Sequence, residues 1–368
     1  MSEKLRELTD IRADIDRIDR ELMRLINERA GHAMDAGHTK RARDGDDTPL
    51  YRPDREAQLL RRVAQINPGP ISNEAMRRVV MEVVSACRAM ELSLTVAYLG
   101  PSGTYTEAAA FKHFGHAVNT SSQSSIDSVF REVESGACAY GVVPIENSTE
   151  GVVSHTLDEF VNSDLSICGE ILVPVNHCLL TNASAMSNIQ CVYSHQQSLA
   201  QCRNWLDVHL PGVRREALSS NAEAARRVAD EPSAAAIASK VAGETYGVGI
   251  LTESIADVPG NTTRFLVIGH DHIQPSGDDK TSVMFYWSRD VPGGLHEAIG
   301  VFARAGVNMT RIESRPSRLQ RWTYMFHVDF VGHRDEEHIR VALAELEART
   351  DFCKVIGSFP RAIAEDSP

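Results

Sequence analysis

The first apolar positions of the chain recur with the spacing of a helix. They lie at residues 8, 11, 15, 18, 22 and 25, at successive intervals of 3, 4, 3, 4 and 3. This heptad seam is typical of a long helix packed on another long helix. If the helix continues to Lys40, about 33 residues span about 50 Å, far more than a lone globular helix. Two short helices in the same chain cannot supply a partner of that length, so we expect a homodimer with intertwined first helices.

Two shorter helical patterns follow. Residues 45–49 (Gly-Asp-Asp-Thr-Pro) break the first pattern, and Pro53 stands where a second helix begins. The run Asn-Pro-Gly-Pro at 67–70 ends that helix, and Ser72 or Asn73 caps a third. Its inward positions are Val79, Val80, Val83, Val84 and Cys87. The first ninety residues therefore predict an all-α unit of three helices.

Between residues 95 and 270 the pattern alternates between strands and helices. Short apolar runs of strand type alternate with helical spacing in two blocks, which predicts two α/β lobes with a cleft between them. The predicted strands are 95–99, 141–145, 171–181, 191–194, 213–217, 234–237, 249–255 and 264–268. The predicted helices include one that follows the turn at 100–104 and carries residues 108–111, and those at 198–209 and 221–229.

The last ninety residues repeat strand and helix in another order. Residues 275–279 are a linker by composition. Beyond them we predict strand 281–287, helix 295–304, strands 307–314 and 322–331, helix 336–349 and strand 353–358. This βαββαβ order is the ferredoxin-like pattern. It contains no catalytic grouping, which indicates a scaffold or a ligand sensor. We therefore divide this multidomain chain into units 1–92, 95–270 and 280–368.

Composition excludes several classes of protein. With 42% apolar and 24% charged residues among 368, the chain is neither disordered nor too small for several cores. A formal charge of −12 argues against nucleic acid as a partner. No apolar run approaches the roughly 18 residues of a membrane helix, and the amino terminus is not signal-like. Seven cysteines without a C-x-x-C pair argue against disulfides and zinc. We expect a cytoplasmic protein without metal or cofactor, in which local arginines hold any anionic substrate.

Cations on the first three helices are the first candidate site. Arg29 and Lys40 are eleven residues apart, about 20° from the same direction on a helix, so one face can present both. By composition alone such charges are usually solvated. The order and approximate spacing of a larger set, however, resemble the active site of the all-helical chorismate mutases: Arg12, Arg29, Lys40, Arg55, Glu56 and Glu91.

The resemblance implies a role for each of these residues. Arg12, lent by the partner protomer, and Arg29 would hold the two carboxylates of chorismate, with Arg55 in support. Lys40 and Glu91 would hydrogen-bond the ether oxygen of the bond that breaks, and Glu56 the substrate hydroxyl. The reaction is a pericyclic rearrangement to prephenate, which needs positioning and electrostatic stabilisation but no nucleophile.

The chain departs from the mutase pattern at three side chains. Arg52 stands where some members have aspartate, and Cys87 where some have serine; both would face the substrate. Glu91 stands where many have glutamine, and a carboxyl group donates to an ether oxygen only when protonated. We expect a mutase rate that rises as the pH falls, unless burial raises the pKa of Glu91 towards neutrality.

Polar residues at predicted element ends form a second candidate site. The polar run that begins at Glu146 follows a buried strand, at the sheet edge where open α/β folds bind ligands. Taken in isolation, such a stretch is more often an ordinary strand followed by a turn. Further motifs make the whole block resemble prephenate dehydratase: Gly100-Pro-x-Gly-Thr104, Pro144-Ile-Glu-Asn147, Ser194-His195 with Gln201-Cys202, and Thr263-Arg264-Phe265.

This resemblance implies that prephenate loses its ring hydroxyl and its ring carboxylate. Thr263 would assist departure of the hydroxyl while the carboxylate leaves as carbon dioxide. Arg264 and the backbone at Gly103 and Thr104 would bind carboxylates. The side chains that would orient the substrate are Asn147, Ser148, Ser194 and Gln201. His195 is a candidate general acid, but a structural histidine is an equally good interpretation.

The last unit resembles the ACT domain attached to dehydratases. Two segments carry the likeness, namely Gly293, Gly294, Leu295 and His296, and Glu313, Ser314, Arg315 and Pro316. The family usually has alanine at the position of Gly294. Such domains pair side by side and bind amino acids at the seam, which implies feedback inhibition by phenylalanine.

Together the three likenesses resemble the bifunctional chorismate mutase–prephenate dehydratases of phenylalanine synthesis. Two other interpretations remain open. The chain is alternatively a non-catalytic amino-acid sensor, which leaves the cations of the first helices unexplained, or a dehydratase whose helical region serves only for dimerisation.

Overall fold

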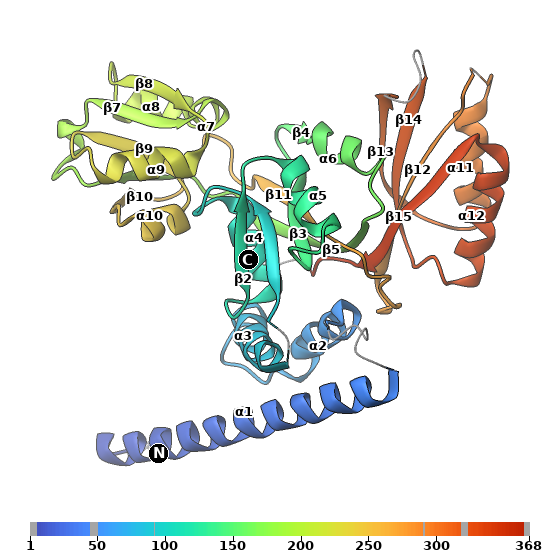
Figure 1. Cartoon of the computed structure of the whole chain (residues 1–368). Coiled ribbons are helices and arrows are strands. Elements are labelled where there is room, and N and C mark those ends of the chain that lie inside the picture. The colour runs from blue at the N-terminus through green and yellow to red at the C-terminus, as the bar shows by residue number, and fades with distance from the viewer. Residues whose placement is uncertain (1–5, 45–50, 92, 290, 318–322, 364–368) are drawn as a thin grey trace, which may run out of the picture.

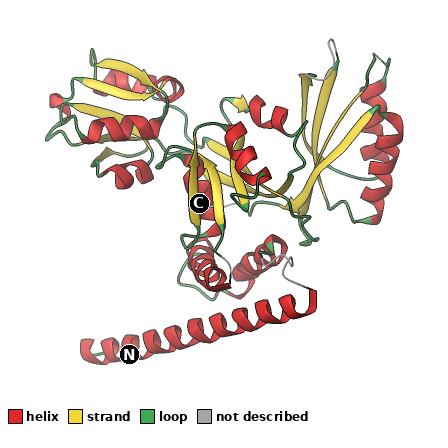
Figure 2. Ribbon diagram, viewed as in Figure 1, coloured by secondary structure: helices red, strands yellow, loops and turns green. Residues whose placement is uncertain are grey.

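The structure, a computed structural model, describes residues 6–44, 51–91, 93–289, 291–317 and 323–363. Figure 1 shows a helical unit below, a central sheet with a second lobe beside it, and a C-terminal sheet on the other side. In its described residues the helical unit contains no strand, whereas the other parts combine both kinds of element (Figure 2). The predicted fold class, three helices followed by a two-lobed α/β region and a ferredoxin-like unit, is confirmed.

The helical unit consists of α1 (Leu8–Asp44), α2 (Pro53–Ile66) and α3 (Asn73–Glu91). α2 begins at Pro53 as expected, and Ser72 caps α3 by accepting from the Ala75 amide. Val79, predicted to face inward, is exposed, because α3 contacts its neighbours only along one side. The predicted break at residues 45–49 lies outside the described residues. α1 runs below the other two helices and extends beyond them (Figure 1).

The first lobe is a mixed sheet in the order β2-β1-β3-β11-β5, with β4 attached to β3. β11 runs antiparallel to both of its neighbours, so the chain returns from the second lobe into the centre of the first. The strands are β1 (Thr95–Leu99), β2 (Asn119–Gln123), β3 (Tyr140–Asn147), β4 (Gly151–Val152), β5 (Ser166–Pro174) and β11 (Thr262–Gly269). The helices are α4 (Tyr105–Phe114), α5 (Ile126–Glu134) and α6 (Ser154–Glu159).

The second lobe is a five-stranded sheet in the order β10-β6-β9-β7-β8. Its strands are β6 (Cys178–Thr181), β7 (Cys191–His195), β8 (Arg214–Leu218), β9 (Ala234–Ala238) and β10 (Ile250–Thr252), and its helices are α7 (Gln196–Gln201), α8 (Arg203–His209), α9 (Asn221–Ala229) and α10 (Lys240–Tyr246), with a short 3₁₀ turn at Met186–Asn188. The two segments that join the lobes are hydrogen-bonded to each other, from the Val175 amide to the Asn261 carbonyl.

Two predicted elements of this region are each divided in the structure. The helix expected at 198–209 is interrupted at Cys202. The two carboxylate oxygens of Asp257 accept hydrogen bonds from the amides of Asn204 and Trp205, and a new helix begins there. The strand expected at 171–181 is broken after Pro174, where the chain leaves the first lobe. Both interruptions depend on distant parts of the chain.

The C-terminal unit has the ferredoxin-like order. It comprises β12 (Asp279–Tyr286), α11 (Gly294–Arg304), β13 (Met309–Pro316), β14 (Tyr324–Val331), α12 (Glu337–Arg349) and β15 (Phe352–Pro360), and the antiparallel sheet runs β13-β14-β12-β15. Its helices cover one face of the sheet (Figure 1). The expected strand start at Trp322 lies outside the described residues.

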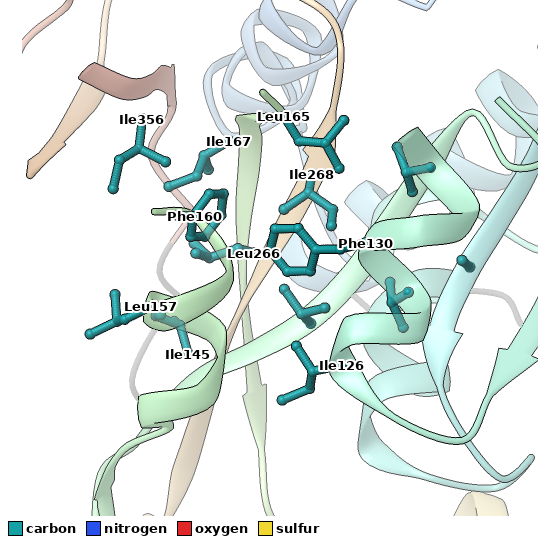
Figure 3. Packing of buried hydrophobic residues seen from close by; sticks show 14 of the residues in the cluster. Ile126, Phe130, Ile145, Leu157, Phe160, Leu165, Ile167, Leu266, Ile268 and Ile356 are labelled. Carbon is teal, nitrogen blue, oxygen red and sulfur yellow. The ribbon is translucent and has the colours of Figure 1, made fainter. Parts of the chain in front are cut away.

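The other face of this sheet continues the core of the first lobe. Ile356 lies in one apolar cluster with Ile167, Phe160 and Leu266 of that lobe (Figure 3). The backbone of Gly357 in β15 lies very close to that of Ile167 in β5. A Cβ at Gly357 would stand 2.5 Å from the carbonyl oxygen of Ile167. The C-terminal unit is therefore fixed directly against the sheet that contains β11.

The segment predicted as a linker, residues 275–279, is an ordered junction. Ser276 donates to Asp279, whose second carboxylate oxygen accepts the Ser276 amide. Arg61 of α2 donates to the carbonyl oxygens of Ser276 and Asp278. Polar, turn-forming residues indicate a connection in a sequence, but they do not show whether other units bind it.

Candidate active sites

A cavity of about 420 Å³ lies among the three N-terminal helices. All three helices contribute to its wall, and six cationic side chains and two carboxylates line it. It contains every mutase-type residue predicted for this chain's own pocket, namely Arg29, Lys40, Arg52, Arg55, Glu56, Cys87 and Glu91. The sequence-based grouping of these residues is therefore reproduced by the fold.

The cations of this cavity differ in what they contact. Arg52 is held by both carboxylate oxygens of Asp54, at 2.9 and 2.6 Å. Within the described residues no ion pair engages Arg29, Lys40 or Arg55. These three side chains are thus available to an anion that enters the cavity.

Arg12 lies outside this pocket. It is exposed on α1, seventeen residues before Arg29. That separation corresponds to a distance of about 25 Å between the two residues along the helix axis. No arginine side chain spans that distance, so Arg12 does not serve the pocket of its own chain.

Glu91 closes the cavity against α1. Its carboxylate lies so close to Gly37 that a Cβ there would stand 2.6 Å from Oε2. Burial raises the pKa of Glu91, while Lys40, Arg41 and Arg29 act in the opposite direction. The net direction of the shift in the Glu91 pKa is upward.

Arg88 is a residue of this site that the sequence analysis missed. Its side chain is buried and donates to Glu56 through Nη1 and to the carbonyl oxygen of Phe114 through Nη2. Its guanidinium also stacks over the ring of Tyr51, 4.9 Å from the centroid. Burial raises the pKa of Glu56, and Arg88 opposes that rise. The sequence offered one signal for Arg88. It directly follows Cys87, and it lies on the same helix face as Glu91, three residues later.

The second candidate site centres on a contact between β3 and β11. The side-chain amide of Asn147 donates to Thr263 Oγ1 at 2.8 Å. The Asn147 carbonyl oxygen is held in turn by the amides of Thr149 and Glu150. With its oxygen accepting from Asn147, the Thr263 hydroxyl keeps its proton for another acceptor. The pairing makes Thr263 a positioned proton donor.

Gln201 joins this pair to the second lobe. Its amide nitrogen donates to Thr149 and Glu150, and its oxygen lies 2.7 Å from Nε2 of His177. Burial lowers the pKa of His177, against the effect of the bond to Gln201. Asn147, Gln201 and Thr263 are therefore brought together, as predicted, at the segments that join the lobes.

A cavity of about 760 Å³ lies between the two lobes. Gly103 and Thr104 line it from the first lobe and His195 from the second. Among the residues that line it, none is lysine or arginine. Instead α4 and α9 begin at its wall, with Thr104 and Ser220 as their N-caps. The amino ends of helices present amide hydrogens and partial positive charge to an anion.

Arg264 was predicted to bind a substrate carboxylate, and the geometry corrects this. It forms ion pairs with Glu170 at 2.8 Å and with Asp329 of the C-terminal unit at 2.6 Å. Successive side chains of a strand point to opposite faces. Because Phe265 lines the cavity, Arg264 lies on the other face, towards the C-terminal sheet.

Three further predicted contacts are already used within the protein. The Gly103 amide donates to Glu107 Oε2 at 2.6 Å and is not free for a substrate. Ser194 is fully buried, within hydrogen-bond distance of Ile237 O and of Asn221, a residue of the cavity wall. Ser148 donates to Asn261 and accepts from the amide of Thr262. Such bonds are not visible in a motif.

His195 has the structural role that the sequence left open, and it also lies on the wall of the cavity between the lobes. Its Nδ1 accepts the Gln197 amide at 3.4 Å, which makes it the N-cap of α7. The same side chain lines the cavity between the lobes. With Nδ1 accepting, the neutral ring presents Nε2 as its donor.

The two ACT-like segments lie on α11 and β13. Gly293 adopts a φ of 77° before α11, a conformation that favours glycine. A Cβ on the buried Gly294 would stand 3.3 Å from Val291 and 3.4 Å from Trp287, so the alanine usual in the family would be tight here. The other segment is the end of β13, an edge strand, with Glu313, Ser314, Arg315 and Pro316.

No helix in the described parts of the chain is long and apolar enough to cross a membrane. Nor does any group of three or more His, Cys, Asp or Glu within those parts have an arrangement suited to a metal ion.

Comparison with family models divides the chain into three matches. Residues 11–92 match the model of chorismate mutase type II, residues 96–273 that of prephenate dehydratase and residues 281–348 that of the ACT domain. A bifunctional chorismate mutase/prephenate dehydratase of Pseudomonas aeruginosa is 48% identical over 360 residues, 97% of this chain and 98% of that protein.

Two solved structures resemble the last two units. The prephenate dehydratase of Arthrobacter aurescens, in complex with L-Phe, is 35% identical with a TM-score of 0.68, covering 73% of this chain and 90% of that one. GqqA, described as a novel type of quorum quenching acylase, is 27% identical with a TM-score of 0.67, covering 73% and 98%. The scaffold alone therefore does not specify a reaction. Identity along nearly the whole length, three matched models in order and a cation-lined pocket in the first unit all agree: the chain belongs to the family of bifunctional chorismate mutase/prephenate dehydratases.

Proposed function

We propose that the protein makes phenylpyruvate from chorismate in two steps, as an enzyme of phenylalanine biosynthesis. The helical pocket rearranges chorismate to prephenate, and the two-lobed region dehydrates and decarboxylates prephenate. The observation that carries this proposal is the helical cavity, where a chain of formal charge −12 gathers six cations around one space. A dimerisation arm or an amino-acid sensor has no use for such a pocket.

In the helical pocket, Arg29 and the partner subunit's Arg12 bind the two carboxylates of the folded substrate, with Arg55 in support. As the ether bond breaks, charge grows on its oxygen, and donors aimed at that oxygen lower the barrier. Lys40 is one donor and protonated Glu91 the other. Glu56, oriented by Arg88, accepts a hydrogen bond from the substrate hydroxyl. Holding the two ends of the rearranging chain together supplies the rest of the rate enhancement.

In the second site, Thr263 donates its proton to the ring hydroxyl of prephenate, which leaves as water. The bond to the ring carboxylate breaks at the same time, carbon dioxide departs, and the released electron pair completes the aromatic ring. Asn147 keeps Thr263 Oγ1 accepting and its proton outward. The alkoxide left on Thr263 regains a proton from water, so atoms and charge balance.

The carboxylates of prephenate bind at the amino ends of α4 and α9. This assignment replaces Arg264 and the Gly103 amide, which are both occupied. Amide hydrogens at helix starts suit carboxylates without a nearby cation. Asn221, held by the amide of His195, presents a further polar group on the same wall.

We also infer a homodimer through α1. The six apolar seam residues of α1 are each between 36% and 59% exposed in the single chain. Such a continuous apolar stripe requires cover, and a second copy supplies a helix of the same length. A partner helix also supplies Arg12 to the pocket, which its own chain cannot do.

The C-terminal unit is assigned the binding of phenylalanine as a feedback inhibitor. The support is the ACT match and the L-Phe complex of the Arthrobacter dehydratase. The second binding segment lies on β13, which is an edge strand of the sheet in the described residues. Such an edge can pair side by side with that of a second copy. Residues 1–92, 95–270 and 280–368 are the proposed mutase, dehydratase and regulatory domains. All seven cysteines are free thiols, which fits the reducing cytoplasm to which we assign the chain.

Two assays test the proposal on the full-length chain: chorismate disappearance and phenylpyruvate formation from prephenate. Arg29→Ala is expected to lower only the first rate, and Thr263→Ala only the second, each by about 100-fold. Arg24→Ala, on the exposed face of α1, and Thr262→Ala, next to Thr263, serve as matched controls. Wild-type protein without phenylpyruvate formation would refute the dehydratase, and Thr263→Ala at the wild-type rate would refute its mechanism.

A further inference from the structure

The Thr263–Asn147 pair has a charged neighbour pair on the other face of the same strands. In the β3–β11 ladder, Thr263 is opposite Asn147 and Arg264 is opposite Glu146. The first pair belongs to the dehydratase site. The second projects towards the C-terminal sheet, because side chains alternate along each strand.

The C-terminal sheet presents a complementary pair at the same place. Arg311 of β13 is opposite Asp329 of β14. Arg264 binds Asp329 at 2.6 Å, and Arg311 lies 3.3 Å from Glu146. The two ladders are thus joined by two ion pairs that cross between the units. We call these four residues the interdomain square.

Arg264, Arg311 and Asp329 of the square are largely buried, whereas the Glu146 side chain is 38% exposed. The side chains of Arg264 and Asp329 are 11% and 3% exposed. Glu170 binds Arg264 from β5 and also Lys280 of β12. Burial alone raises the pKa of Asp329, but Arg264 and Arg311 lower it overall. Charged hydrogen bonds in a dry environment fix geometry strictly, and losing one partner leaves another charge buried without compensation.

We propose that Asp329, a residue of the regulatory domain, is a positioning residue of the dehydratase site. It fixes Arg264 and thereby the β11 backbone that carries Thr263, so the regulatory domain helps to set Thr263 against Asn147. This inference rests on the proposed dehydratase function and deepens it. The same square links β11 to β13 through Arg311, which lies two residues before Glu313 of the ACT-like segment. Ligand binding at that segment therefore acts on Thr263 through Arg311 and Asp329.

The alternative role of Arg264, as a ligand of a substrate carboxylate, makes a different kinetic prediction. Loss of a substrate ligand raises KM, whereas misplacement of a proton donor lowers kcat with little effect on KM. A double-mutant cycle separates the two roles as well. Residues that act through each other give non-additive effects, whereas independent ones add.

The experiment compares Asp329→Asn, Arg264→Gln and the double variant in the full-length protein. Asp329→Asn is expected to lower kcat for prephenate about tenfold or more while KM stays within about twofold. It is also expected to weaken inhibition by added phenylalanine and to leave mutase turnover unchanged. The double variant is expected to be no worse than Arg264→Gln. Asp335→Asn, an exposed aspartate of the same domain, is the matched control.

Thermal unfolding and mutase turnover of each variant show whether the chain is folded. If Asp329→Asn does not fold, Asp329→Glu, which keeps the charge but moves the carboxylate, takes its place with the same expected kcat loss. Wild-type kcat and inhibition in the folded variant, or a rise in KM alone, overturns the inference. A wild-type protein without dehydratase turnover refutes the proposed function instead, so the two failures are distinct.

Discussion

Arg88 holds Glu56 with one terminal nitrogen and the main-chain carbonyl of Phe114 with the other. One buried side chain of α3 therefore orients a residue of the mutase pocket and binds the helical unit to α4 of the dehydratase. Both contacts are made within a low-dielectric environment, where an arginine fork is rigid and its loss is costly.

Arg88→Leu is expected to impair the mutase more than the dehydratase. Burial already raises the pKa of Glu56, and without Arg88 it rises further, so more Glu56 is protonated and unable to accept the substrate hydroxyl. Mutase kcat/KM at neutral pH is expected to fall by about tenfold to 100-fold. Stability is expected to fall by about 3 kcal/mol, the cost of breaking a buried pair.

Steady-state kinetics and chemical denaturation check this prediction. Arg88→Lys keeps the positive charge and is expected to recover part of both losses. Arg78→Leu removes an exposed arginine of the same helix and is the control. Equal mutase rates for Arg88→Leu and Arg78→Leu would contradict the assigned role.

The pH dependence of the mutase is expected to follow Glu91. A carboxyl group donates to the ether oxygen only while protonated, so the rate falls as the pH rises through its pKa. Burial raises that pKa, which extends the active range above that of a free glutamate. Glu91→Gln donates at every pH and is expected to give a flat profile, with a rate above the wild type in alkali. A flat wild-type profile from mild acid to alkali would remove Glu91 from the mechanism.

The sequence predicted which residues meet more reliably than where they point. The heptad seam, the Pro53 start and the Ser72 cap are local signals, and each element follows from nearby residues. The mutase cations converge because three helices with defined spacing leave few alternatives. The interruption at Cys202 was missed because Asp257, more than fifty residues away, creates it.

Arg264 and Arg88 show the same limit within the candidate sites. In a Thr-Arg-Phe triplet on a strand, the side chains of Thr263 and Arg264 point to opposite faces of the sheet. The motif-based prediction nevertheless assigned both side chains to the substrate. Only the docked C-terminal sheet, with Asp329, shows what occupies that face. Arg88 resembled an ordinary solvated cation, because nothing local indicates that Phe114 and Tyr51 cover it.

Gly37 is expected to set the position of Glu91. Gly37→Ala places a methyl group in the space of Glu91 Oε2, which has to move. The far end of a flexible side chain moves at little cost, so stability is not expected to fall, whereas mutase kcat is expected to drop about tenfold. Gly31→Ala is a matched control on the same helix, with nothing within 4 Å of the added atom.

Alanine is the better helix former at both glycine positions, by about 1 kcal/mol. Gly31→Ala is therefore expected to raise the melting temperature without changing the mutase rate. The two variants are compared by thermal unfolding and mutase kinetics. A mutase rate that is unchanged in Gly37→Ala would show that the displaced carboxylate has no part in catalysis.

A shared mutase pocket predicts complementation between two inactive variants. If Arg12 serves the partner's pocket, Arg12→Ala and Arg29→Ala each lose mutase turnover. In a mixed dimer, the pocket of the Arg12→Ala chain has its own Arg29 and receives an intact Arg12 from the other chain. Random pairing on co-expression gives half mixed dimers with one working pocket of two, so about a quarter of the wild-type rate returns.

Dehydratase turnover serves as the internal measure of protein amount, because neither substitution touches that site. Adding Ile18→Glu in the exposed seam of α1 is expected to abolish the recovery by separating the chains, which size-exclusion chromatography with light scattering follows. A mixture no more active than its components, in a protein that remains dimeric, would place Arg12 outside the mutase pocket. Recovery of the quarter would show that each pocket combines residues of two chains, because no single chain in the mixture contains both arginines.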